Sequence, residues 1–234
     1  MLVFTDAGIQ FLLRWLHFLA GITWIGLLYY FNFVQGPFFA EADAATKSNA
    51  TQKLVPRALW WFRWGAMVTF LSGAAILMIR GAEMSAVVWS TSWGVSILTG
   101  AAFGTLMFLN VWLVIWPNQK IVIGSAVAVA GGGQADPRAA AAARRAFLAS
   151  RTNVVFSFPM LFFMGAASHL AYTISGSITV YVLLVGAITA LVEVNALVGS
   201  AGPLKKPLET VSNVITTGLV VSVIVYGLIE GVLA

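Results

Sequence analysis

Residues 177–198 read SITVYVLLVGAITALVEVNALV, an apolar run of helical length with a single ionisable residue, Glu193. About 20 apolar residues in a helix span the hydrocarbon core of a bilayer, so this stretch predicts a transmembrane helix. Other runs of the same kind lie on both sides of it. By that length rule the chain has six predicted spans, at about 8–34, 60–80, 94–116, 153–175, 177–198 and 211–233.

Composition supports this interpretation. The 234 residues are 60% hydrophobic and only 9% charged, whereas a soluble domain carries about 25% charged residues. We therefore predict an all-α polytopic membrane helix bundle of about six helices, with residues 1–234 forming one transmembrane domain. The chain has no cysteine, which excludes disulfides, thiolate metal sites, iron–sulfur clusters and a covalently attached c-type haem.

Basic residues predict the orientation. The net charge is +5, but the Lys and Arg residues stand between apolar runs, as topology signals do, and indicate no nucleic-acid partner. They concentrate in the loops after spans one, three and five, whereas the loops on the other side carry only Arg80. The positive-inside rule then predicts that both termini are extracytoplasmic and that the loop 117–152 is cytoplasmic. We expect Pro117 to end the third span, and residues 121–130 to lie at the interface because they are too few to cross.

The two histidines of the chain, His17 and His169, both fall within predicted spans. Intramembrane ionisable residues are costly and usually face a partner, a cavity or a cofactor. At 1.5 Å per residue, His17 lies about 14 Å and His169 about 9 Å inside the outer ends of spans one and four. Because these spans run in opposite directions, we expect both imidazoles in the outer half of the membrane, where they could face each other.

Glycines accompany both histidines. Gly21 and Gly165 each lie four residues deeper than a histidine, on the same helix face, and leave room there for a flat macrocycle. We therefore predict a b-type haem with His17 and His169 as metal ligands, with Gly21 and Gly165 beside the ring and Arg14 binding a propionate. Two simpler readings stay open. The histidines could be hydrogen-bonded across helix contacts that need no cofactor, and Arg14 could snorkel to the interface.

Glu193 is the deepest acidic residue. We expect it to pair with Arg63 in the second predicted span; the alternative is a proton relay. The sequence identifies no catalytic residue.

Several segments share a family pattern. They are Arg14-Trp15-Leu16-His17 with Gly21 and Trp24-Ile25-Gly26, then Trp116-Pro117-Asn118-Gln119-Lys120, Ser150-Arg151-Thr152-Asn153, Ser157-Phe158-Pro159, Leu161-Phe162-Phe163-Met164 and Ser168-His169. In this order they resemble the bacterial membrane-bound urate oxidase (urate hydroxylase) family. The resemblance runs from span one to span four.

This resemblance implies a multi-pass redox protein of the bacterial inner membrane, connected with oxidation of urate to 5-hydroxyisourate. Longer family members carry a C-terminal cytochrome c, but this chain ends after its sixth predicted span without a cysteine, so the resemblance covers the membrane domain only. It also has Thr152 where the family pattern often has a histidine. We therefore expect electrons from urate or another small reductant to pass to a separate acceptor, a cytochrome c or a quinone.

Filling both axial positions with histidine leaves no open site on the iron, which favours outer-sphere electron transfer over oxidation at the metal. Two other functions stay open. One is a small-solute carrier and the other a cofactor-free accessory subunit of a larger membrane complex. Besides the lipid bilayer, the expected partners include further copies of the chain or other subunits.

Overall fold

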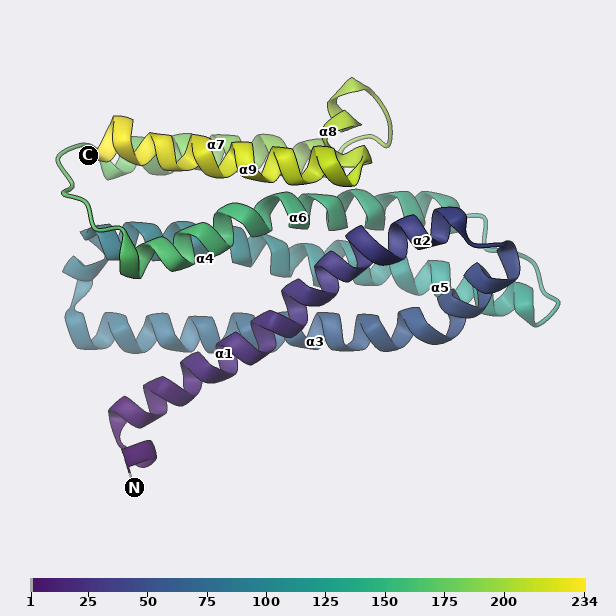
Figure 1. Cartoon of the computed structure of the whole chain (residues 1–234), viewed down its shortest axis with the longest axis horizontal. Coiled ribbons are helices and arrows are strands. Elements are labelled where there is room, and N and C mark those ends of the chain that lie inside the picture. The colour runs from purple at the N-terminus through teal and green to yellow at the C-terminus, as the bar shows by residue number, and fades with distance from the viewer. Residues whose placement is uncertain (1) are drawn as a thin grey trace.

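The computed structural model describes residues 2–234, and within this range it contains helices and no strand. Six helical rods are long and apolar enough to cross a membrane, which confirms the predicted all-α bundle (Figure 1). In chain order the elements are η1 (Leu2–Phe4), α1 (Asp6–Tyr29), η2 (Tyr30–Gln35), α2 (Gly36–Glu41), α3 (Ala44–Met84), η3 (Ala86–Ser90), α4 (Ser92–Leu109), η4 (Asn110–Ile115), α5 (Trp116–Ala130), α6 (Ala139–His169), α7 (Ile178–Leu197), η5 (Pro203–Lys205), α8 (Lys206–Glu209), α9 (Val211–Leu228) and η6 (Ile229–Leu233).

Helix α6 forms the centre of the bundle. It packs against α4, α5, α7 and α9, and 15 of its 31 residues are buried. By contrast, only four of the 24 residues of α1 are buried, because α1 lies across the outside of the bundle along α3 (Figure 1). Exposed Phe and Leu side chains on α1 suit contact with lipid.

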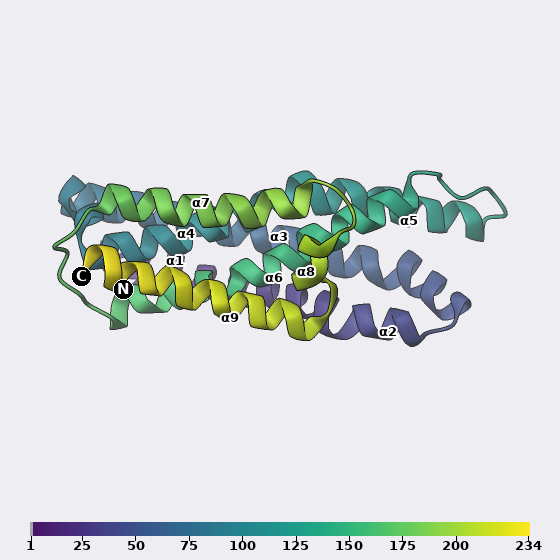
Figure 2. The same cartoon turned by 90° about the horizontal axis from the view of Figure 1, so that it is seen from above.

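The rods differ in length. Helices α7 and α9–η6 have 20 and 23 residues, enough for the hydrocarbon core, whereas α1–α2, α3 and α4–α5 have 36, 41 and 39. At 1.5 Å per residue the longer rods extend about 55–60 Å and so continue well beyond the core. The extension consists of α2, α5 and the first turns of α3 and α6, and it projects past the ends of α7 and α9 (Figure 2).

Two helix boundaries differ from the sequence-based expectation. Pro117 does not end a helix, because the π-helical segment η4 directly before it widens the backbone, and Asn118 Nδ2 donates to Val114 O at 2.7 Å. Residues 121–130 therefore continue the same rod. Helix α6 ends at His169 rather than at 175, because the following segment pairs with the chain end: Ser175 N and Gly176 N both donate to Leu233 O.

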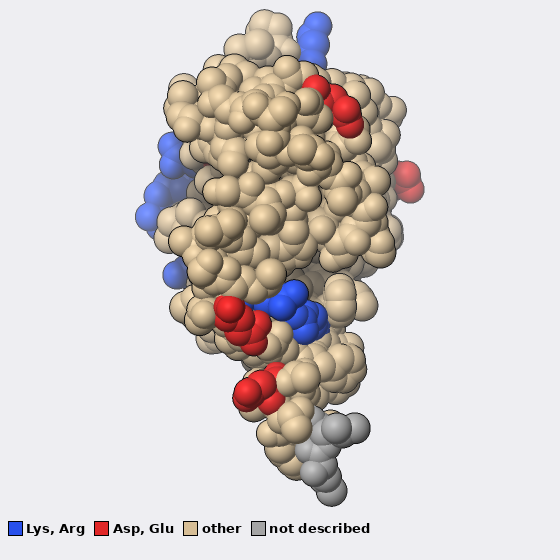
Figure 3. Space-filling model, turned by 90° about the vertical axis from the view of Figure 1, so that its left-hand side faces the viewer, with Lys and Arg blue, Asp and Glu red and all other residues tan. Residues whose placement is uncertain are grey.

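Both termini lie at one end of the bundle (Figure 1), and the face at that end is mostly uncharged, with separate acidic and basic patches (Figure 3). Ten of the 13 Lys and Arg residues, against four acidic residues, lie instead in 41–57, 117–151 and 198–210 at the opposite end. We call this opposite end the basic end.

Small residues allow the helices to approach closely. A Cβ atom at Gly100 of α4 would lie 3.2 Å from Met160 O and Met164 N of α6, and both are backbone atoms. A Cβ at Gly65 of α3 would lie 3.2 Å from Trp24 N of α1. Such contacts between small residues are how helices associate in a membrane.

Candidate functional site

His17 lies half-buried in the contact between α1 and α3. Its Nδ1 is 3.2 Å from Ser72 Oγ. Ser72 Oγ also lies 2.6 Å from Val68 O and 3.1 Å from Thr69 O; with its proton on either carbonyl, the hydroxyl accepts a hydrogen bond from His17. In that arrangement Nδ1 of His17 carries the proton, and Nε2 keeps its lone pair. This is the tautomer that a metal-ligating histidine needs, held by an outer hydrogen bond as such ligands usually are.

The glycine that makes room for this imidazole is Gly73. A Cβ atom there would lie 3.0 Å from His17 Cε1, whereas a Cβ at Gly21 would meet only the Thr69 side chain at 3.9 Å, an ordinary contact. Sequence reasoning did not identify Ser72 or Gly73. Their adjacency as two small residues inside span two was the available signal, but it does not specify which helix packs against them.

Arg14 belongs to a series of hydrogen-bonded polar side chains near the end of the bundle where both termini lie. Its Nη2 donates to Gln10 Oε1 at 3.3 Å, and Gln10 donates to Glu83, which also lies 3.6 Å from Arg80. Arg14 thus has a polar partner on its own helix. Its predicted contact with a propionate stays a prediction.

His169 is the last residue of α6 and is exposed. A hydrogen bond between Tyr29 Oη and Ser157 Oγ, 2.9 Å long, joins the antiparallel helices α1 and α6. Each histidine is 12 residues from this bond, about 18 Å along its helix. A Cβ at Gly165 would meet nothing within 4 Å, so the surface beside His169 is open.

Equal spacing along the two helices does not place the histidines at one height, because α1 runs obliquely across the bundle and packs on α3 rather than on α6 (Figure 1). In the described residues, no three His, Asp or Glu side chains come together as a purely protein-ligated metal site would need. The donors available for a metal are the two imidazoles. His17 is half-buried against α3, and His169 is exposed at the end of α6.

A layer of buried polar side chains crosses the bundle near residues 150–153 of α6. Asn32 Nδ2 donates to Ser150 Oγ at 2.8 Å, and Asn110 Nδ2 donates to Asn153 Oδ1 at 3.0 Å. Asn32 lies in η2 and Asn110 begins η4, so both π-helical segments turn an asparagine towards α6. π-helical turns within longer helices frequently occur at functional sites.

The expected ion pair between Glu193 and Arg63 is wrong. Glu193 instead accepts a hydrogen bond of 3.1 Å from Asn110 Nδ2. The guanidinium of Arg63 lies 3.8 Å from the ring centroid of Trp116, in a cation–π contact. Arg63 and Glu193 belong to α3 and α7, which lie on different sides of the bundle, and this separation could not be read from the sequence.

Arg151 of the same layer is buried, with 5% of its surface exposed, and its Nε and Nη1 have no partner. Its guanidinium carbon lies 5.0 Å from the centroid of the Phe147 ring. Arg144 lies 5.3 Å from the centroid of the same ring and pairs with Glu209 of α8 through both carboxylate oxygens. These bonds hold the pKa of the Glu209 carboxyl below its usual range.

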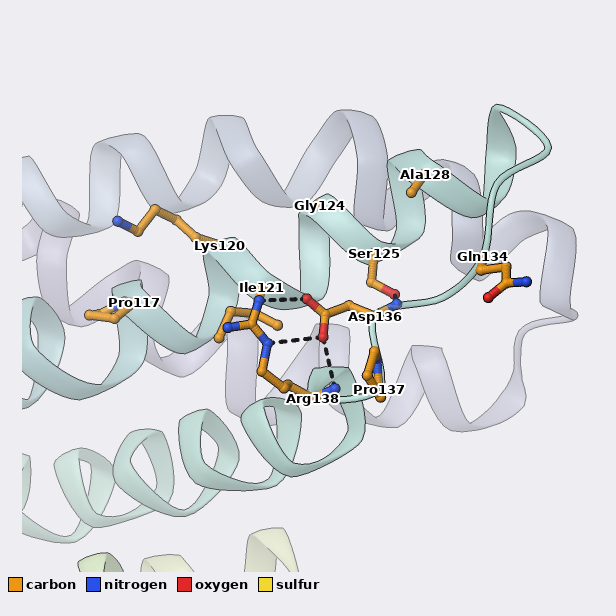
Figure 4. A pocket seen from close by; sticks show the side chains of 10 residues that line it. All are labelled: Pro117, Lys120, Ile121, Gly124, Ser125, Ala128, Gln134, Asp136, Pro137 and Arg138. Carbon is orange, nitrogen blue, oxygen red and sulfur yellow. Dashed lines mark hydrogen bonds and ion pairs between the residues drawn. The ribbon is translucent and has the colours of Figure 1, made fainter.

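Two cavities lie towards the basic end. The larger, of about 820 Å³, borders α5 and the loop before α6 (Figure 4). Its polar groups satisfy one another: Arg138 Nη2 lies 2.8 Å from Asp136 Oδ2, and Ser125 Oγ accepts from Asp136 N at 3.0 Å. The hydrogen bonds from Arg138 lower the pKa of Asp136 to about 2. None of the buried unpartnered atoms in the described residues lines this cavity, so nothing there requires a ligand.

The smaller cavity, of about 120 Å³, lies inside the bundle where η2, α3, α5 and α6 meet. Amide side chains and aromatic rings line it, and one of its atoms, Gln35 Oε1, is buried without a partner. Sequence reasoning missed this site because its walls come from four separate segments.

Comparison with known proteins supports the resemblance seen in the sequence. Residues 82–226 match the model of the family described as Urate oxidase N-terminal. No curated protein and no solved structure matches the chain. The matched region begins near the end of α3 and contains α4 to α8 and most of α9, including the central helix α6. The chain therefore belongs to the urate oxidase N-terminal family.

Proposed function

We propose that this protein is a membrane-integral redox protein that holds one b-type haem between His17 and His169 and passes electrons from urate, or another small reductant, to a separate acceptor. Family membership supports urate as the reductant. The observation that carries the haem assignment is the contact between His17 Nδ1 and Ser72 Oγ, which leaves Nε2 free as a ligand.

When bound, the haem would supply a one-electron redox couple. The protein's own residues have distinct tasks towards it. Ser72 keeps the His17 proton on Nδ1, and Gly73 leaves space for the imidazole against α3. His169 would provide the second ligand from α6, and the open surface at Gly165 would let the edge of the ring approach the backbone. Arg14 would neutralise a propionate.

With two histidine ligands the iron has no open position, so the protein would transfer electrons rather than bind oxygen. The acceptor would be a separate cytochrome c or quinone. We further propose that the basic end is cytoplasmic and both termini extracytoplasmic, in the inner membrane of a bacterium. The shared end of the two termini and the distribution of basic residues support this orientation.

An absorption spectrum of the purified protein tests the proposal. We expect a six-coordinate b-type haem at one per chain, lost in both His17→Ala and His169→Ala and kept in the control Asn49→Ala, an exposed residue of α3. A colourless wild-type protein would refute the haem assignment. Haem retained in His169→Ala would show that the second ligand is not His169. Urate-dependent reduction of added cytochrome c or quinone tests the reductant.

A further inference from the structure

The smaller cavity has a polar wall with free hydrogen-bonding capacity. Asn32 Nδ2 donates hydrogen bonds of 2.8 Å to both Leu28 O and Ser150 Oγ, but Oδ1 of the same side chain has no protein partner. Gln35 Oε1 is buried and unpartnered, and the Gln119 amide has no hydrogen bond to protein. An unpaired buried polar group costs about 1–3 kcal/mol, so this wall is suited to a polar occupant.

Aromatic rings form other parts of the wall. Phe31 and Phe62 contact edge to face, with centroids 5.4 Å apart, and Phe147 lines the cavity from α6. Ring faces of this kind stack on flat π-systems. The cavity therefore combines surfaces for a planar ring with carboxamides that can donate and accept hydrogen bonds at its edge.

The volume of the cavity is large enough for a small organic molecule and not only for one water. A polar cavity needs a volume of only about 10–15 Å³ to hold one water, whereas the volume of this cavity is about 120 Å³. Its position also favours an anion, because it lies towards the basic end, where Lys and Arg outnumber acidic residues by ten to four. A surplus of one charge raises the local concentration of a ligand of opposite charge.

We propose that this cavity binds a flat, amide-rich heterocycle of the oxopurine class. The amides of Gln35 and Gln119 and the free Oδ1 of Asn32 pair with its ring N–H and C=O groups, and the phenylalanines cover its faces. This inference rests on the proposed function for its choice of ligand. It adds a place for that ligand, separate from the two histidines and near the opposite end of the bundle.

Equilibrium binding of urate to the full chain in lipid nanodiscs tests the site. Gln119→Leu removes one amide of nearly the same size, and Ala143→Phe fills the cavity from an exposed position on its rim. We expect each to weaken urate binding at least tenfold. The matched control is Gln134→Leu, which removes an exposed amide outside this cavity and should bind as the wild type does. Wild-type affinity in both cavity variants, or no urate binding by the wild type, would overturn the proposal.

The haem spectrum separates this proposal from the proposed function. The cavity variants should keep the wild-type spectrum, and His17→Ala should still bind urate. If the wild type oxidises urate and the cavity variants leave KM unchanged, the site is wrong and the function stands. If the wild type binds urate in this cavity but holds no haem, the site stands and the redox assignment fails.

Discussion

Replacing Ser72 by alanine tests the geometry at His17 most directly. The change removes the acceptor 3.2 Å from Nδ1 and leaves the backbone of Thr69, which also contacts His17, in place. Without it the imidazole loses its preferred tautomer and orientation. Loss of such an outer partner typically lowers metal affinity 10–100-fold, which corresponds to about 1.4–2.8 kcal/mol.

Titration of haemin into the apoprotein, followed at the Soret band, measures this effect. We expect the Kd for haem to rise 10–100-fold in Ser72→Ala, together with a shifted midpoint potential. The control is Ser222→Ala in α9, where the hydroxyl likewise donates to the backbone of its own helix, to Gly218 O at 2.8 Å, but is remote from both histidines. Equal affinities and potentials for Ser72→Ala and the control would refute the role given to Ser72.

Three further predictions concern stability, measured as thermal unfolding in detergent. Gly100→Ala should lower the free energy of unfolding by about 1–3 kcal/mol, because the added Cβ would press on the backbone of α6. Gly104→Ala, one turn further along α4, faces the flexible Met160 side chain and should change this free energy by less than about 0.5 kcal/mol. Equal losses in the two variants would contradict the packing of α4 on α6. Asn153→Leu should lower the free energy of unfolding by about 1–3 kcal/mol, since it leaves Met107 O without its 2.9 Å hydrogen bond. An unchanged melting temperature would argue against the layer of buried polar side chains near residues 150–153. The pKa of Asp136 is lowered from 3.8 to about 2, so its ionised carboxylate stabilises the fold fully above pH 4, and this stabilisation is lost as the pH falls towards 2. Asp136→Asn should remove that part of the acid sensitivity of the melting temperature. A variant with the same dependence of melting temperature on pH as the wild type would disprove this role of Asp136.

Hydropathy located the membrane-crossing helices well. The predicted span 177–198 corresponds to α7 at Ile178–Leu197, and 211–233 corresponds to α9 and η6 at Val211–Leu233. The agreement has a simple reason: lipid cannot hydrogen-bond a backbone, so an apolar run of this length must be helical. Hydropathy did not show how far the other helices continue into water, because helices outside the bilayer depend on propensity and packing instead.

The candidate site was only partly readable from the sequence. His17 could be selected because an ionisable residue in an apolar run is conspicuous. Ser72 and Gly73 could not, since two small residues in a span look alike whether they face lipid, a helix or an imidazole. The expected pairing of Arg63 with Glu193 failed for a related reason: opposite charges attract at close range, but their distance depends on how the helices are arranged.

By itself the sequence determined that this is a multi-pass helical membrane protein and that its basic residues concentrate in alternate loops. These properties follow from composition and from the solvent that each segment can tolerate. Only the tertiary structure decided which side chain contacts His17, that Arg63 stacks on Trp116 rather than pairing with Glu193, and that amide side chains from two segments line one cavity. Such contacts depend on the rotation of each helix about its axis, and one turn of a helix looks the same in sequence whichever neighbour it faces.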